Sequence, residues 1–253
     1  MLENKKLKIS VIIAAGGKSV RLGENTSKQF VLLENKPLLF YSLEKFLSMK
    51  EVNEIIISSD NVNATNKMLD SLILKNNVKT ISGGELRQDS VYRGFCSLEL
   101  PCDLVVIHDV ARPFFEISDL QNCINEAYES GASVLAVPVT DTIKKVKSDN
   151  NNNKLAVEKT IQRDGLYQIQ TPQVFKYDLL LDAYKKLYKD KNNKLTFTDE
   201  AAMLEHLGKT VSIVIGKRKN IKITFREDLE IAEAVLQSEK NKIQYAYANA
   251  KDN

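Results

Sequence analysis

Short apolar runs alternate with segments of helical spacing along most of the chain. The apolar runs are rich in β-branched residues and predict strands at residues 9–15, 55–58, 78–82, 104–108, 133–137 and 211–215. The helical spacing lies between these runs, at residues 37–49, 64–74, 90–98 and 118–130. Strands joined through helix-length segments imply right-handed crossovers and a mostly parallel sheet with both faces covered. The pattern therefore predicts a doubly wound α/β fold.

One stretch departs from this pattern. Residues 139–165 alternate in polarity around an asparagine run at 150–153, which predicts a long antiparallel hairpin with a polar tip. Such a β-arm is a candidate dimer contact, although a surface hairpin without a partner would show the same pattern. The tail after Ser238 is polar and weakly patterned, so we expect it to be ordered only in part. We therefore predict one Rossmann-like domain over residues 1–238, with the arm inserted in it, and a polar tail over residues 239–253.

Composition narrows the class of protein. The 253 residues are 43% apolar and 27% charged, and the formal charge of +3 is too small to indicate a nucleic-acid partner. Cys96, Cys102 and Cys123 are odd in number and lack CxxC spacing, which argues against a disulfide scaffold or a zinc site and fits a reducing compartment. No long apolar segment follows a basic head, so we expect a cytoplasmic protein with no membrane partner.

The predicted sheet directs attention to the loops after its first, third, fourth and fifth strands, because ligands bind at the carboxyl ends of parallel strands. The first loop begins with Gly16 and Gly17 and supplies Lys18, Arg21 and Lys28. Glycines let backbone N–H groups approach a ligand, and nearby cations compensate phosphate charge, so this loop indicates a nucleotide site. An ordinary glycine turn beside a solvated basic face is the alternative, and the loop alone does not decide between them.

The second loop, GGELRQDSV at residues 83–91, carries groups that could read a base. Gly83 and Gly84 leave backbone N–H groups accessible, and Arg87 offers a fork of donors. The hydroxyl of Ser90 could bind the hydrogen-bonding edge of a base. A serine at a helix start is more commonly only an N-cap, and this alternative stays open.

The third loop, HDVARP at residues 108–113, combines a carboxylate with a cation. Asp109 ends a strand, where it could hold a divalent cation that bridges phosphates, and Arg112 could bind a phosphate through two donors. An Asp–Arg ion pair that serves only structure is the alternative. We expect His108 to be packed in the core and assign it no chemistry.

The remaining candidates lie in and beyond the predicted arm. The loop PVTDTIKKV, at residues 138–146, offers Thr142 and Lys144 at the base of the arm. In the basic turn GKRKNIKIT, at residues 216–224, Lys222 lies between two isoleucines, so its side chain is expected to point to one defined face. The three cations before it could be a solvated surface.

Taken together, these segments resemble the cytidylyltransferase family that makes 4-diphosphocytidyl-2-C-methyl-D-erythritol in the non-mevalonate isoprenoid pathway. The resemblance covers residues 9–236. It rests on six ordered motifs: AAGG…R…KQF, GGELRQDSV, HDVARP, PVTDTIK, QRDGLYQIQTPQVF and GKRKNIKIT. The sister family that activates ribitol 5-phosphate shares much of this pattern, whereas PVTDTIKKV and TDEAAMLE are more similar to the methylerythritol family.

The resemblance implies roles for individual residues. The phosphates of CTP would be wrapped by Ala14, Ala15, Gly16, Gly17 and Arg21, with Lys28 reaching the α-phosphate. The rest of the nucleotide would be bound by Gly83, Gly84, Arg87, Ser90, Asp109 and Val110. Methylerythritol phosphate would be held by Arg112, Thr142, Arg163 and Lys222. The groups expected to act in catalysis are Arg21, Lys28, Arg163 and Lys222.

The resemblance also implies a metal and a partner. Mg²⁺ is the expected cofactor, with Asp109 as its protein ligand. Members of the family are homodimers that interlock by the arm, so Thr142 and Arg163 could act in the site of the partner subunit.

Three departures from the family pattern are visible. The segment GGKSVR has one residue more than the usual AAG-x-G-x-R and lacks its second spaced glycine, which leaves the backbone contacts of Gly17 and Lys18 in question. Ser27 stands where the family usually has a proline. Val110 stands where the family usually has an alanine close to the ribose, which implies a slightly tighter pocket.

The implied reaction suits the residues. A phosphate monoester that attacks the α-phosphorus of CTP is already ionised near neutral pH, so no general base is needed. Positioning and charge compensation should dominate such a transfer. Two alternatives stay open: a ribitol-5-phosphate cytidylyltransferase and, from another class, a nucleotide-binding regulator that has lost catalysis. A dinucleotide-dependent dehydrogenase is disfavoured because the first loop lacks GxGxxG.

Overall fold

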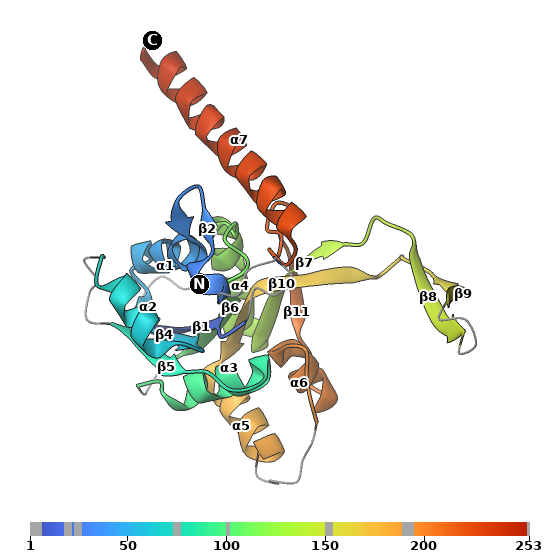
Figure 1. Ribbon diagram of the computed structural model, residues 1–253. Coiled ribbons are helices and arrows are strands. Elements are labelled where there is room, and N and C mark those ends of the chain that lie inside the picture. Colours follow the sequence, from blue (N-terminus) through green and yellow to red (C-terminus); the bar gives the residue numbers. More distant parts are fainter. Residues whose placement is uncertain are drawn as a thin grey trace.

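A computed structural model describes residues 7–17, 22, 27–72, 77–99, 102–149, 154–188 and 195–251. Its central sheet has the strand order β11-β7-β10-β6-β1-β4-β5 (Figure 1). These strands are β1 (Ile9–Ala15), β4 (Val52–Ser59), β5 (Val78–Ser82), β6 (Leu104–Asp109), β7 (Ala132–Pro138), β10 (Tyr167–Lys176) and β11 (Ser212–Ile215). Strand β10 runs antiparallel to both neighbours, β6 and β7, and the other pairings of this sheet are parallel.

Helices cover both faces of the sheet, because successive strand residues point to opposite sides. In β1, Val11 and Ile13 pack with one core cluster, and Ile12 packs with another. The first cluster includes apolar residues of α1, α2 and α4, and the second includes residues of α3, α5 and α6. The helices are α1 (Leu38–Ser48), α2 (Val62–Leu69), α3 (Arg87–Cys96), α4 (Ile117–Ser130), α5 (Tyr177–Tyr188), α6 (Glu200–His206) and α7 (Arg226–Lys251).

The predicted fold class is confirmed. Every strand and helix predicted from the apolar pattern is present, with ends that shift by a few residues. The pattern did not predict β2, β3, β10, α5, α6 or α7. Strand β10 includes the polar run QTPQ between apolar residues, and this run lacks the β-branched character of the other strands.

The predicted arm is also present. It consists of β8 (Ile143–Asp149) and β9 (Lys154–Ile161), which pair antiparallel as a separate two-stranded sheet. Figure 1 shows this hairpin projecting away from the body of the molecule. The asparagine run at its tip lies outside the described residues.

Three short elements follow the first loop. A single 3-10 turn, η2 (Lys28–Phe30), leads into a small hairpin made of β2 (Leu32–Leu33) and β3 (Lys36–Pro37). A third core cluster joins Leu33 of this hairpin to Ile223 and to Ala232 of α7. Helix α7 continues to Lys251 and crosses residue 238, where we expected the domain to give way to a partly ordered tail.

Candidate active site

The first and third loops meet at one edge of the sheet. Ala14 pairs with Asp109 in the β1–β6 register, and the Val110 N–H donates to the Ala14 carbonyl at 3.1 Å. The Gly17 carbonyl accepts from the Lys28 N–H at 3.0 Å. Both strands run in the same direction, so the two loops leave the sheet side by side. Arg21 and Lys18, which were predicted to line this edge, lie outside the described residues.

Lys28 connects this edge to the basic turn of residues 216–224. The side chain of Lys28 is only 8% exposed, and its ammonium Nζ donates to the Ile223 carbonyl at 2.8 Å. A methyl group on Gly17 would lie 3.9 Å from Lys28 Cδ, so the lysine stem runs directly beside the glycine loop. The fold therefore brings Lys28 next to the segment that carries Lys222, although 193 residues separate them in the sequence.

The glycines of the second loop are required by close packing. A Cβ on Gly83 would lie 2.9 Å from Ser90 Oγ, and a Cβ on Gly84 would lie 2.2 Å from Asp89 Cβ. The Gly84 N–H donates to Ser90 Oγ at 2.9 Å, and Gly16 of the first loop also packs near this hydroxyl. Ser90 is not the N-cap of α3, because Leu86 holds that position. The N-cap interpretation of Ser90 is therefore wrong, and its hydroxyl instead ties the loop to the first turn of the helix.

Asp109 lies at the centre of a network of ion pairs. One oxygen of its carboxylate accepts from Arg87 Nε at 2.8 Å, and the other accepts from Lys222 Nζ at 2.7 Å. Burial alone would raise the pKa of Asp109, but the charges of Arg87 and Lys222 outweigh it and hold the pKa well below its usual range. The carboxylate is therefore ionised. An Asp–Arg pair between Asp109 and Arg112 was the structural alternative; Asp109 pairs instead with Arg87.

Arg87 is shared between two acids. Its NH1 group donates to both oxygens of Glu200, the first residue of α6, at 3.2 and 2.9 Å. Burial would lower the pKa of Arg87, but Glu200 and Asp109 outweigh that effect and raise it. The sequence did not point to Glu200. Its motif, TDEAAMLE, was noted only as part of the family resemblance.

Arg112 lines a cavity of about 300 Å³ that opens beside Lys222. The guanidinium donates to the carbonyls of Asn220, at 2.9 Å, and Ile169, at 3.2 Å. Burial lowers the pKa of Arg112. The cavity is lined by Arg112, Val137, Gln168, Gln170, Arg218, Asn220, Ile221, Lys222 and Asp228. Three cations against one carboxylate make this lining suited to an anionic ligand with polar groups.

Thr142 and Arg163 are not among the residues that line this cavity. Both side chains are exposed, and Arg163 donates to the Thr140 carbonyl at the base of the arm. Arg218 contacts the same threonine, because its NH1 group donates to Thr140 Oγ1 at 3.1 Å. The predicted substrate-binding residues thus form two groups within this chain, one in the cavity and one on the arm.

His108 is packed in the core, as expected. Its ring packs edge-on against Phe46 and Phe115, which stack on each other, and burial lowers its pKa to about 3. Nε2 lies 3.1 Å from the Arg112 carbonyl, which can only accept, so we assign the proton to that nitrogen. Nδ1 then accepts from Thr171 Oγ1 at 3.1 Å. The neutral imidazole holds the third loop in place.

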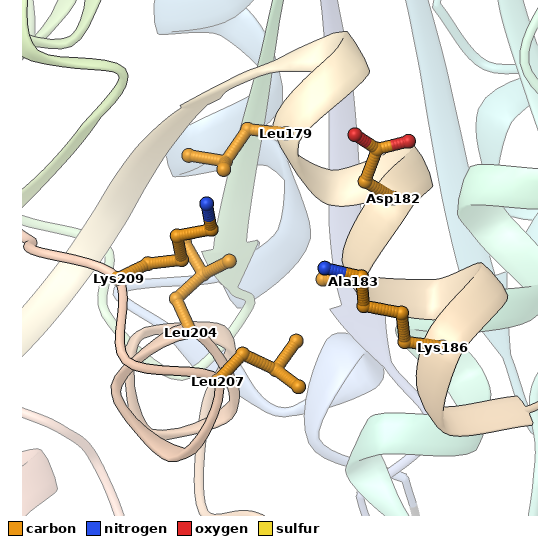
Figure 2. Close-up of a pocket in the computed structure, with 7 residues that line it drawn as sticks. All are labelled: Leu179, Asp182, Ala183, Lys186, Leu204, Leu207 and Lys209. Carbon is orange, nitrogen blue, oxygen red and sulfur yellow. The ribbon is translucent and has the colours of Figure 1, made fainter.

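One smaller pocket in the described part of the chain cannot hold a nucleotide. Figure 2 shows a pocket between α5 and the end of α6, with Asp182 and Lys186 on one side and Lys209 on the other. Its volume of about 40 Å³ is far too small for a nucleotide. Within the part of the chain that the structure describes, no helix is long and apolar enough to cross a membrane.

Comparison with known proteins gives a consistent result. The family model of 2-C-methyl-D-erythritol 4-phosphate cytidylyltransferase matches residues 9–238. The chain belongs to this family. A protein of that name from Alkaliphilus metalliredigens is 39% identical over 237 residues, which cover 92% of this chain and 95% of the relative. One from Clostridium botulinum strain Langeland is also 39% identical, over 91% of this chain and 98% of its own length.

Solved structures agree. The 4-diphosphocytidyl-2C-methyl-D-erythritol synthase of Anaerococcus prevotii superposes with a TM-score of 0.77 at 28% identity, covering 92% of this chain and 97% of that one. The cytidylyltransferase of Thermus thermophilus gives a TM-score of 0.72 at 28% identity, covering 91% and 100%. The resemblance predicted from the six motifs is confirmed, and the ribitol 5-phosphate alternative is not favoured.

Proposed function

We propose that this chain joins CTP to 2-C-methyl-D-erythritol 4-phosphate and releases pyrophosphate, as the names of its relatives describe. One observation carries the proposal: Asp109 pairs with Lys222 beside a cation-lined cavity, and Lys28 of the first loop binds the carbonyl of the next residue, Ile223. A nucleoside triphosphate and a second phosphate both need such charge compensation. The three free cysteines support the further proposal that the protein works in the cytoplasm.

The residues can promote the reaction by placement and charge. A phosphate oxygen of the sugar forms the new bond to the α-phosphorus of CTP, while the bond from that phosphorus to the bridging oxygen of the β-phosphate breaks. The monoester is largely ionised near neutral pH, since its second pKa is about 6, so no side chain has to remove a proton. Lys28 and Arg21 would stabilise charge on the α-phosphate and on pyrophosphate. Arg112 and Lys222 would hold the attacking phosphate.

A magnesium ion fits this proposal. Among the described residues no group of three or more His, Cys, Asp or Glu side chains is placed to hold a metal. Mg²⁺ commonly takes one or two carboxylates and completes its shell with substrate phosphates and water. The ionised Asp109 at the sheet edge could contribute one carboxylate, through the lone pairs that its contacts with Arg87 and Lys222 leave available. The ion would supply positive charge on the triphosphate.

We also propose that the protein is a homodimer through the arm. Ile143, Val146, Leu155 and Val157 of the hairpin are exposed apolar residues. Exposed Ile169 and Ile215 flank Ala136 on the sheet face opposite α4, so the body also presents apolar surface. In such a dimer, Thr142 and Arg163 could reach the cavity of the other subunit.

Mixed dimers test this arrangement. At a concentration of methylerythritol phosphate well below the KM of each variant, Arg163→Ala and Lys222→Ala chains would each be weakly active alone. If Arg163 acts across the dimer, then mixed dimers regain activity, because one of the two sites has both residues. Failure to regain activity in dimers shown to be mixed by mass would place Arg163 in its own subunit's site or outside the reaction.

The reaction itself is tested by pyrophosphate release. Purified protein with CTP and Mg²⁺ should release pyrophosphate only when methylerythritol phosphate is added. Ribitol 5-phosphate in its place is the matched control and should give much slower release. Equal or faster release with ribitol 5-phosphate would reassign the substrate, and no release with either would leave a nucleotide-binding protein without catalysis.

A further inference from the structure

Glu200 forms the inner end of a buried row of charges that reaches the cavity. The side chains of Glu200, Arg87, Asp109 and Lys222 alternate in sign, and each contact is between 2.7 and 3.2 Å. Glu200 is 2% exposed and Asp109 is 7% exposed, whereas the side chain of Lys222 is 44% exposed. The row therefore runs from the core to the solvent-facing lysine.

The orientation of the Arg87 guanidinium decides which of its nitrogens donate to Asp109. Within a guanidinium group, Nε and NH2 lie on one edge and can grip both oxygens of a carboxylate. Arg87 uses only Nε on Asp109, and its NH2 is buried without a hydrogen-bond partner among the described residues. Both oxygens of Glu200 bind NH1 on the other side. Glu200 thus helps to set the orientation in which only Nε of Arg87 donates to Asp109.

If both Nε and NH2 of Arg87 donated to Asp109, then the cavity would change. Asp109 Oδ2, which now accepts from Lys222, would then also accept from Arg87 NH2. Repulsion between the two cations on one oxygen would weaken the contact that fixes the Lys222 ammonium at the rim of the cavity. An ammonium on a flexible stem loses side-chain entropy again when it binds a phosphate, so a lysine that is not held in place binds more weakly.

We propose that Glu200 is a positioning residue for the sugar phosphate, acting through Arg87 and Asp109 to hold Lys222 at the cavity. This inference rests on the proposed function, since it takes the cavity as the sugar-phosphate site. Nothing in the proposed chemistry requires Glu200 to touch either substrate.

The start of α6 does not depend on Glu200 alone, which makes the proposal testable. Asp199 caps the helix by accepting from the Ala202 N–H at 2.8 Å, and it also accepts from Gln173 Nε2 at 2.9 Å. The segment before it is held by Gln88, whose Oε1 accepts from the Phe197 N–H at 2.7 Å. Glu200→Gln keeps the size of the side chain, so these contacts should keep α6 in place.

The test measures binding, so that it does not depend on turnover. The dissociation constant of methylerythritol phosphate is measured by calorimetry in the presence of a CTP analogue with a methylene bridge between the α- and β-phosphorus. Glu200→Gln should weaken this binding about tenfold, a coupling typical of residues in one network. Glu205→Gln, at an exposed position of the same helix, is the matched control and should not change it.

A second background separates positioning from general damage. In a Lys222→Ala chain, Glu200→Gln should change the dissociation constant by less than about twofold, because the residue it acts through is gone. The same loss in both backgrounds, or no loss in either, would overturn the proposal. If Glu200→Gln fails to fold, then Glu200→Asp is used in the same cycle, since it keeps the charge but withdraws the carboxylate.

A crystal structure of Glu200→Gln gives an answer independent of any ligand. We expect Arg87 to bind both oxygens of Asp109 and Lys222 to leave it. An unchanged contact between Asp109 and Lys222 would overturn the inference even if the protein is a fully active cytidylyltransferase. Conversely, a wild-type protein that releases no pyrophosphate with either sugar phosphate would refute the proposed function while leaving this structural result intact.

Discussion

The two halves of the sheet edge hold their functional groups by different means. On the β5-β4-β1-β6 side, backbone groups and glycines dominate: the Gly83 N–H donates to the Ser59 carbonyl at 2.8 Å, and the Val110 N–H donates to the Ala14 carbonyl. On the β10-β7-β11 side, long side chains such as Arg218 supply the contacts. Main-chain hydrogen bonds fix the loops of the first half. In the second half, the contacts come from long cationic side chains that can change rotamer. Substitutions in the two halves should therefore fail in different ways.

The largest expected effect is at Lys28, which joins the two halves. Lys28→Ala removes a buried ammonium placed for the α-phosphate, so turnover should fall about 100- to 1000-fold, or roughly 3–4 kcal/mol of transition-state stabilisation. Steady-state kinetics with saturating substrates measures this. Lys67→Ala, at an exposed position of α2, is the control. Turnover within a fewfold of wild type would remove Lys28 from the reaction.

Lys222 belongs to the second half, so its loss should weaken binding of one substrate only. Lys222→Ala should raise the KM for methylerythritol phosphate about tenfold, the value of one charge-assisted contact, and leave the KM for CTP nearly unchanged. Lys209→Ala, an exposed lysine beside the small α5–α6 pocket, serves as the control. If both KM values rise together, then the division of the edge into two halves is wrong.

Substitutions in the first half should instead lower the free energy of unfolding. A Cβ on Gly94 of α3 would lie 2.6 Å from Ile12 Cγ2 and 3.1 Å from Ser58 Oγ, inside the packed core. Gly94→Ala should therefore destabilise the fold by about 1–3 kcal/mol, less the gain of up to about 1 kcal/mol in helix propensity. Urea denaturation measures this change, with the exposed Cys96→Ala on the same helix as control. An unchanged midpoint for Gly94→Ala would contradict the packing.

The smallest effect concerns the support under the third loop. Lys45 donates to the carbonyls of Pro113 and Phe115, and burial lowers its pKa to about 8 from 10.5. Between these two values the unfolded chain binds a proton that the folded chain has released, so the contribution of Lys45 to the free energy of unfolding rises with pH. Lys45→Met should flatten the pH dependence over this range. The exposed Lys50→Met is the control, and an unaltered slope in Lys45→Met would contradict the lowered pKa.

The sequence predicted the strands and loops of the first half because their signals are local. An apolar run that ends at Gly16 and Gly17 shows both the strand and the loop within a few residues. The second half depends on contacts between distant segments. Asp109 and Lys222 are 113 residues apart, as are Arg87 and Glu200, and no periodicity connects such pairs.

Two features could not be predicted from the sequence, because they depend on contacts that exist only in the folded chain. Ser90 has the residue type of an N-cap, but the helix begins three residues earlier than the spacing suggested, so its hydroxyl turns to Gly84. Strand β10 contains QTPQ, and its buried polar side chains find partners on other elements, such as Asp199, which accepts from Gln173 Nε2. Arg21 lies outside the described residues, so its proposed role at the α-phosphate stays a prediction.

The reversed direction of β10 has a consequence for how the chain is routed. Its first residues pair with the last residues of β7, so the polypeptide returning from the hairpin enters the sheet at the edge where the parallel strands finish. No crossover helix is needed, and Gln168 and Gln170 become wall residues of the cavity a few positions after the hairpin ends. The hairpin and that wall belong to one continuous stretch of chain, so a shift of the hairpin would move the wall residues of the cavity.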